Sequence, residues 1–405
     1  MIDRFVLAAL TAQYAFFPLY GTLSAFAPHP PTAPLVSFGV AVMFVSLMLL
    51  AVLGVAVGAL RSRRSPVALR SVLLVNLTAT YVGALLGFDP AVGLGLATLV
   101  AGGVLAHLVL IAYYREPGVA RAVFLGILVS GLAVSLLAIA FVAFKAPVDL
   151  YAYNHGRAVG SFLNPNELAA YLLAYMSVAA GLAIVKRGSP VGIFATLCGI
   201  AGAVAFTLTF SRWGLAAAFV GILAFAIPLR SRRALTVALG VLALAVVVNS
   251  VLWRTHHDPQ DTDARGVAWS AGISTFLHFP ITGVGPLAFE RLYSVMRAPS
   301  APGAQTPIAF DPHDLPLSIL SETGLFGFVA FVWLVVAFFR ELIRACASAP
   351  PQHRTLALAV GAGVLAIIVH SVLNSVSVFF SLLTEFTGLA LAAAYWGFEP
   401  HAEAT

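Results

Sequence analysis

Long apolar runs, separated by short polar or basic connections, recur along the whole chain of 405 residues. An α-helix needs about 20 apolar residues to cross a bilayer, and twelve runs come close to that length. They cover residues 5–27, 35–60, 70–88, 91–113, 122–145, 166–185, 191–210, 213–229, 234–253, 315–339, 354–373 and 380–397. The pattern predicts an all-α polytopic membrane protein of about twelve transmembrane helices, with residues 1–405 as a single integral membrane domain.

One long segment, residues 254–314, interrupts the apolar pattern between the ninth and tenth runs. Bulky apolar residues recur there at helical spacing, at Trp269, Ile273, Phe276 and Leu277. Residues 261–263 supply side chains that favour an N-cap, which would place Arg265 in the first turn of the helix. The segment is therefore expected to be a long loop that contains a helix.

The basic residues set the orientation of the predicted spans. Short basic clusters such as RSRR at 61–64 and 230–233 lie between apolar runs. If the N-terminus is cytoplasmic, 15 of the 22 Lys and Arg residues fall on the cytoplasmic side, as the positive-inside rule requires. Both termini are then cytoplasmic and the long loop is extracytoplasmic. Three basic residues still lie in short external connections: Lys145, Arg157 and Arg212.

Composition narrows the function classes further. The chain is 60% hydrophobic and only 9% charged, which excludes an ordinary soluble domain. A net charge of +6 raises the question of nucleic acid, but the sequence has no long basic face. The two cysteines, Cys198 and Cys346, have no metal-binding spacing.

The external arginines predict an anion site. Guanidinium groups form bidentate contacts with phosphate, and Arg265 near a helix N-terminus would add to the positive end of the helix dipole. A lipid pyrophosphate is the anion expected at this depth, bound by Arg157, Arg212 and Arg265. The alternative is that these side chains extend to lipid headgroups or pair with nearby acids.

His313 is the candidate general base. It lies between Asp311 and Asp314 at the end of the long loop, and a carboxylate beside an imidazole fixes its tautomer and raises its basicity. A plain alternative is that the histidine and an aspartate cap the tenth span. A metal site is a third possibility, although these adjacent side chains cannot complete a coordination sphere alone.

Two glutamates lie within predicted spans, where an ionisable residue is costly and therefore a functional candidate. Glu322 is about two turns into the tenth span and is assigned a supporting role. Glu385 lies in the last span, and its role stays open. Gly324 and Gly327 permit a close approach between helices, for packing or for function.

From His313 onward the chain reads H-D-x9-G-x-x-G. This resembles the histidine motif of the bacterial O-antigen ligases, which belong with O-antigen polymerases and pilin O-oligosaccharyltransferases. Residues 265–289 and 156–174 are similar to the loop and the upstream arginine region of that superfamily. The ligases usually have Asn, Ser or Gln after the motif histidine, where this chain has Asp314.

The resemblance implies a GT-C type glycosyltransferase of the bacterial inner membrane. Its members move a glycan from undecaprenyl pyrophosphate to the lipid A core on the periplasmic side, in lipopolysaccharide biosynthesis, and the family works without metal or nucleotide. The expected partners are this glycan donor, the lipid A core acceptor and membrane lipids, with no nucleic acid. Arg265 and His313 match the essential positions of the family, and Arg157 and Arg212 match its additional arginines.

Three alternatives remain at this point. A polymerase would use the same donor with a lipid-linked glycan as acceptor, although polymerases more often have two large external loops. A protein O-oligosaccharyltransferase would glycosylate pilin. A transporter also fits twelve spans, but transporters tend to place binding groups near the bilayer midplane on broken helices.

Overall fold

The computed structural model describes thirteen labelled helices and no strand within the residues that it places. Those residues are 7–8, 10–12, 14, 67–113, 118–162, 164–229, 232–252, 261–296, 312–372, 374 and 379–395. The helices are α4 (Val67–Leu86), α5 (Pro90–Ala112), α6 (Val119–Phe144), α7 (Val148–Tyr153), α8 (Pro165–Val185), α9 (Pro190–Thr207), α10 (Arg212–Leu229), α11 (Arg232–Leu252), α12 (Asp261–His278), α13 (Phe289–Met296), α14 (Leu315–Ser348), α15 (Pro351–Val372) and α16 (Phe379–Tyr395).

Eight of these helices are long and apolar enough to cross a membrane. They are α4, α5, α6, α8, α9, α10, α14 and α15, and α16 has a shorter apolar stretch, Leu382–Tyr395. The chain is therefore an all-helical, multi-pass membrane protein. Helix α11 occupies the ninth predicted span, while most of the first two, 5–27 and 35–60, lies outside the described residues. The total of twelve spans stays a prediction.

Several spans start at a capping side chain followed by proline. Asp89, Asn164 and Ser189 each accept a backbone N–H bond at the start of α5, α8 and α9, and each is followed directly by proline. A polar cap satisfies a free N–H group, and proline at the first helical position costs no hydrogen bond. These local signals explain why the predicted spans begin within a residue or two of the observed helices.

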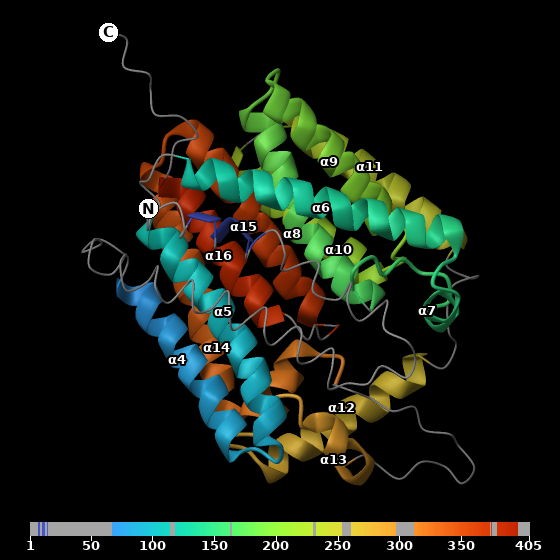
Figure 1. Ribbon diagram of the computed structural model, residues 1–405, viewed down its shortest axis with the longest axis vertical. Helices are drawn as coiled ribbons and strands as arrows, with labels where there is room; N and C mark the ends of the chain where they lie inside the picture. The colour runs from blue at the N-terminus through green and yellow to red at the C-terminus, as the bar shows by residue number, and fades with distance from the viewer. Residues whose placement is uncertain are drawn as a thin grey trace.

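Helices α8 and α15 form the centre of the bundle. Helix α15 packs against α8, α10 and α16, and α8 also packs against α9; Figure 1 shows α15 and α16 in the middle of the molecule. Small residues allow the close approach, as at Gly181 of α8, where an added Cβ would lie 2.8 Å from Ala359 of α15. Outward-facing apolar residues on α9, such as Ile193 and Leu197, are exposed, as expected for a lipid-facing side.

Helix α14 is broken at Gly324, where the connection between α12 and α13 inserts against it. Gly324 has φ 65 and ψ −167, and a Cβ there would collide with the backbone of Ile281. Because helix interruption frees backbone groups, their partners matter. Four backbone bonds supply them: Val284 N to Ser321 O (2.9 Å), Gly285 N to Glu322 O (2.9 Å), Leu325 N to Pro280 O (2.8 Å) and Phe326 N to Ile281 O (3.3 Å).

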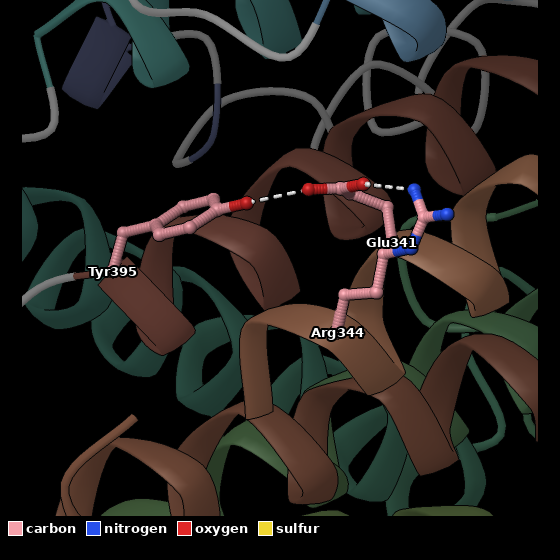
Figure 2. A network of polar contacts seen from close by, with 3 residues as sticks. All are labelled: Glu341, Arg344 and Tyr395. Atoms are coloured by element: carbon pink, nitrogen blue, oxygen red, sulfur yellow. Dashed lines mark hydrogen bonds and ion pairs between the residues drawn. The ribbon is translucent and has the colours of Figure 1, made fainter. Parts of the chain in front are cut away.

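The other end of α14 is tied to the end of α16. The Tyr395 hydroxyl donates to Glu341 Oε1 at 2.7 Å, and Arg344 lies 3.8 Å from the same carboxylate (Figure 2). Helices α12 and α13 gather at the lower end of the bundle in Figure 1, and α12 packs against both α13 and α14. The long loop segment is thus fixed to the bundle through α14.

The helix predicted within the long loop is confirmed, but the placement of Arg265 in its first turn was wrong. Helix α12 begins at Asp261, which places Arg265 in the second turn of the helix. The acidic residues Asp261 and Asp263 occupy the first turn, where negative charge is favourable. The apolar face does not pack inward: Trp269, Ile273 and Leu277 are exposed, whereas small Ala268 and Ala271 are fully buried. Small residues are what permit α12 to lie closely on its neighbours.

Candidate functional site

Arg157 is held in place by two hydrogen bonds from its guanidinium group. Its Nε–H donates to Thr209 O at 2.9 Å, and Nη2 donates to Asn166 Oδ1 at 3.2 Å. The backbone beside it is fixed too, because Ala158 N donates to Leu208 O at 2.9 Å. Asn166 lies in the first turn of α8, and Thr209 lies in the short connection from α9 to α10. A loop arginine is therefore anchored to helix α8 and to the connection between α9 and α10.

The hydrogen bonds continue from Asn166 to a buried histidine on α15. Ser211 Oγ donates to Asn166 Oδ1 at 3.2 Å, and the same Oγ lies 3.4 Å from His370 Nε2. Ser211 Oγ also accepts from Gly214 N at 3.1 Å, so it caps α10. His370 has no exposed surface. Four segments, the Arg157 loop and the ends of α8, α10 and α15, meet through these side chains.

The structure brings Arg265 to the same place. The charges of both Arg157 and Arg265 act on the His370 ring, although the two arginines are more than 100 residues apart in sequence. Arg212 directly follows Ser211 and is the first residue of α10, with an exposed side chain. Arg157 and Arg212 thus lie near the start of α10, and Arg265 is close enough to His370 for its charge to act on the ring.

His313 lies in the turn before α14, with backbone φ of 54. The left-handed region is uncommon for a residue other than glycine, and such positions recur at functional sites. Helix α12 supports this turn: a Cβ at Gly272 would lie 3.2 Å from Pro312. Arg265 precedes Gly272 by about 10 Å along the helix axis. Helix α12 therefore extends from the arginine cluster to the histidine turn.

Of the two aspartates beside His313, the structure describes only Asp314. Asp314 is the N-cap of α14, and its Oδ1 accepts from Leu317 N at 2.8 Å. Burial raises the pKa of this carboxyl, and the Leu317 N–H opposes that shift. The capping interpretation is thus confirmed for Asp314. Asp311 lies outside the described residues. Among the residues that are described, no three His, Cys, Asp or Glu side chains group as a metal site.

Glu322 lies at the break in α14, where its carbonyl oxygen accepts from Gly285 N. Its described role is thus through the backbone, and a role for its carboxylate stays a prediction. Glu385 lies elsewhere, buried on α16, where its carbonyl accepts from the Tyr14 hydroxyl at 2.9 Å.

Sequence reasoning missed the residues that hold Arg157: Asn166 and Thr209 bond to it directly, and Ser211 and His370 extend this chain of bonds. An ionisable residue inside a span is itself a signal, and that rule selects His370. Three buried atoms near the end of α15 also have no hydrogen-bond partner among the described residues: His370 Nδ1, Ser371 Oγ and Asn374 Nδ2. Buried polar groups normally have partners, so this cluster calls for a functional explanation.

Comparison with known families places this site in context. Residues 197–332 match the model of the family described as O-antigen ligase. The matched segment runs from α9 into α14 and contains Arg212, Arg265 and His313. No curated protein matches the chain. The match confirms the predicted resemblance to the O-antigen ligase and polymerase superfamily, whose members are glycosyltransferase-like enzymes of lipopolysaccharide biosynthesis.

Proposed function

From the match to the O-antigen ligase family, we propose that this protein is an O-antigen ligase of the bacterial inner membrane. It transfers a glycan from undecaprenyl pyrophosphate to the lipid A core, and residues 254–314 form a periplasmic loop at the active face. The observation that carries the proposal is the Arg157 guanidinium, which Thr209 O and Asn166 Oδ1 hold near the start of α10, where Arg212 lies. A fixed guanidinium group at Arg157, with an exposed arginine at Arg212, suits a pyrophosphate, and we assign Arg265 to the same anion.

The reaction is an inverting displacement. A hydroxyl oxygen of the acceptor sugar attacks the anomeric carbon of the donor, and the bond from that carbon to the pyrophosphate oxygen breaks. His313 orients the hydroxyl and takes its proton. Arg157, Arg212 and Arg265 stabilise the negative charge that grows on the leaving pyrophosphate. Because pyrophosphate is already a good leaving group, positioning and electrostatic stabilisation supply most of the acceleration.

Asp311, Asp314 and Glu322 support the site in this scheme. Asp314 fixes the start of α14 through its bond to Leu317 N and thereby the turn that carries His313. No resident metal or nucleotide is required, which follows the expectation from the family. The GT-C architecture with twelve spans and both termini in the cytoplasm belongs to the same proposal.

One structural feature weighs against a transporter. Transporters use the free ends of broken helices to bind their substrates, and α14 is indeed broken at Gly324. However, the backbone groups of Ser321, Glu322, Leu325 and Phe326 around the break are bonded to residues 280–285. The break therefore serves to dock the α12–α13 connection rather than to bind a solute.

Reconstituted glycan transfer tests the proposal. Purified protein in proteoliposomes receives undecaprenyl-pyrophosphate glycan and rough lipopolysaccharide, with a chelator present. We expect glycan on the lipid A core. Arg265→Ala should lower the rate by about 10²–10³-fold, and His313→Ala by about 10²–10⁴-fold. Arg344→Ala is the matched control, because Arg344 pairs with Glu341 at the far end of α14 (Figure 2).

The choice of acceptor separates the ligase from its relatives. Glycan that extends another lipid-linked glycan, and leaves the lipid A core unmodified, would assign a polymerase. Glycan on added pilin would assign a protein O-oligosaccharyltransferase. Normal transfer by His313→Ala would remove His313 from the mechanism.

A further inference from the structure

We propose that His370 is a positioning residue of the glycan-transfer site, which holds the Arg157 guanidinium through Ser211 and Asn166. This inference rests on the proposed function, because it assigns Arg157 to the pyrophosphate. It adds a residue of α15, which lies outside the matched segment 197–332. His370 is fully buried in an apolar helix, and two cationic side chains act on it. Burying an imidazole there is costly, so packing alone does not account for it.

The direction of each hydrogen bond follows from the chemistry of the groups. Arginine has only donors, so the Asn166 atom that faces Arg157 must be the amide oxygen. The same oxygen accepts the Ser211 hydroxyl proton at 3.2 Å. A serine has one proton to give, and Ser211 Oγ must then accept from His370 at 3.4 Å. His370 therefore has its proton on Nε2.

This chain of bonds explains how a loop arginine can be kept in one orientation. A free arginine side chain loses rotamer entropy when it is fixed, and bonds to fixed partners meet that cost before the ligand binds. Residues 155 and 156 just before Arg157 have positive φ, 51 and 76, so the loop turns sharply there. His370 anchors the far end of the chain of bonds to α15, one of the central helices.

Two conservative substitutions separate this role from simple packing. In His370→Gln the side-chain amide nitrogen can replace Nε2 and donate to Ser211, whereas in His370→Asn it can reach only the position of Nδ1. The probe is undecaprenyl pyrophosphate without glycan, and its Kd is measured on the full-length protein in detergent. We expect His370→Gln to bind like the wild type and His370→Asn to bind about fivefold more weakly, as for one lost hydrogen bond.

A double-mutant cycle tests whether His370 acts through Arg157. Arg157→Lys keeps the charge but loses the planar fork, so binding remains measurable. In that background His370→Asn should have no further effect, because the group that it positions is gone. Additive effects would overturn the proposal, as would equal Kd values for the Gln and Asn variants. Ser211→Ala, which interrupts the chain from α10, replaces His370→Asn if that variant does not fold.

The two proposals fail in different ways. A wild-type protein that binds undecaprenyl pyrophosphate but transfers no glycan would refute the ligase, while the Gln and Asn comparison would still decide the role of His370 from the binding data. A wild-type protein that does not bind the lipid pyrophosphate would refute both.

Discussion

His107 and His370 are both buried imidazoles in apolar helices, but their surroundings differ. His107 lies on α5, where its Nδ1 is 3.0 Å from Thr384 O and 3.2 Å from Thr387 Oγ1 of α16. His370 has a single long contact to Ser211 through Nε2, and its Nδ1 has no partner among the described residues. Two arginine charges act on His370. One histidine joins two helices, and the other ends a chain of hydrogen bonds that leads through Ser211 and Asn166 to Arg157.

The difference shows how buried polar groups divide between stability and function. A carbonyl oxygen accepts only, so His107 carries its proton on Nδ1 and is paired there with α16. A paired polar group of this kind specifies how two helices pack. Within the part of the chain that the structure describes, His370 Nδ1, Ser371 Oγ and Asn374 Nδ2 near the end of α15 lack such a partner. A ligand bound beside Arg157 would supply partners for these groups.

The largest effect on stability is expected at His107. His107→Ala removes a buried ring and its bond to α16, which should lower the free energy of unfolding by about 2–4 kcal/mol. The activity per folded molecule should stay normal, as judged by thermal unfolding and glycan transfer on the same preparation.

The Asn and Gln variants make the comparison sharper. Because His107 is bonded through Nδ1, His107→Asn should retain more stability than His107→Gln, the opposite of the preference expected for binding at His370. The same preference at both histidines would mean that the two rings have the same role, and the contrast would fail.

Sequence reasoning located the described helices because the signals that mark them are local. Apolar length, a capping residue and a following proline fix where a helix starts, so the described spans fall where they were predicted. Arg157 and Arg212 were singled out because basic residues in short external connections oppose the positive-inside rule, and Arg265 because it was expected near the N-terminus of a helix. The family match over residues 197–332 agrees with the motif around His313.

The remaining features depend on contacts between distant segments. Nothing in the local pattern of α15 shows that His370 meets Ser211, 159 residues earlier. The spacing of Trp269, Ile273 and Leu277 likewise identified one face of α12, but it could not show that the small residues Ala268 and Ala271 are the buried ones.

A smaller effect is expected at Asp314, which is a paired polar group next to the site. Asp314→Ala removes the cap of α14 and should cost about 1 kcal/mol of unfolding free energy, whereas Asp314→Asn keeps a cap. Burial raises the pKa of the wild-type carboxyl. Its charged form is thus disfavoured in the fold, and this group lowers stability as pH rises from the ordinary value of 3.8 through the raised pKa.

The pH dependence distinguishes the two roles of this carboxyl. Asp314→Asn should be slightly more stable than the wild type at neutral pH, and the difference should shrink as the pH falls toward 3.8. Thermal unfolding over this pH range measures it. A wild-type protein that is more stable than Asp314→Asn at neutral pH would show that the charge itself is needed, for instance beside His313.

The smallest change in unfolding free energy is expected for Ser371→Ala. Its sign should differ from that of the control substitution Ser135→Ala. Ser135 on α6 is fully buried and donates to Gly131 O at 2.7 Å, as serines in helices commonly do. Ser371 is equally buried, but its hydroxyl has no partner among the described residues. Removing a paired hydroxyl should cost about 1 kcal/mol, whereas removing an unpaired one should be neutral or slightly stabilising. Thermal unfolding of Ser135→Ala and Ser371→Ala in ligand-free protein compares them directly. If Ser371→Ala is destabilised as much as Ser135→Ala, the Ser371 hydroxyl has a hydrogen-bond partner in the folded protein. A ligand is then not needed to explain its burial.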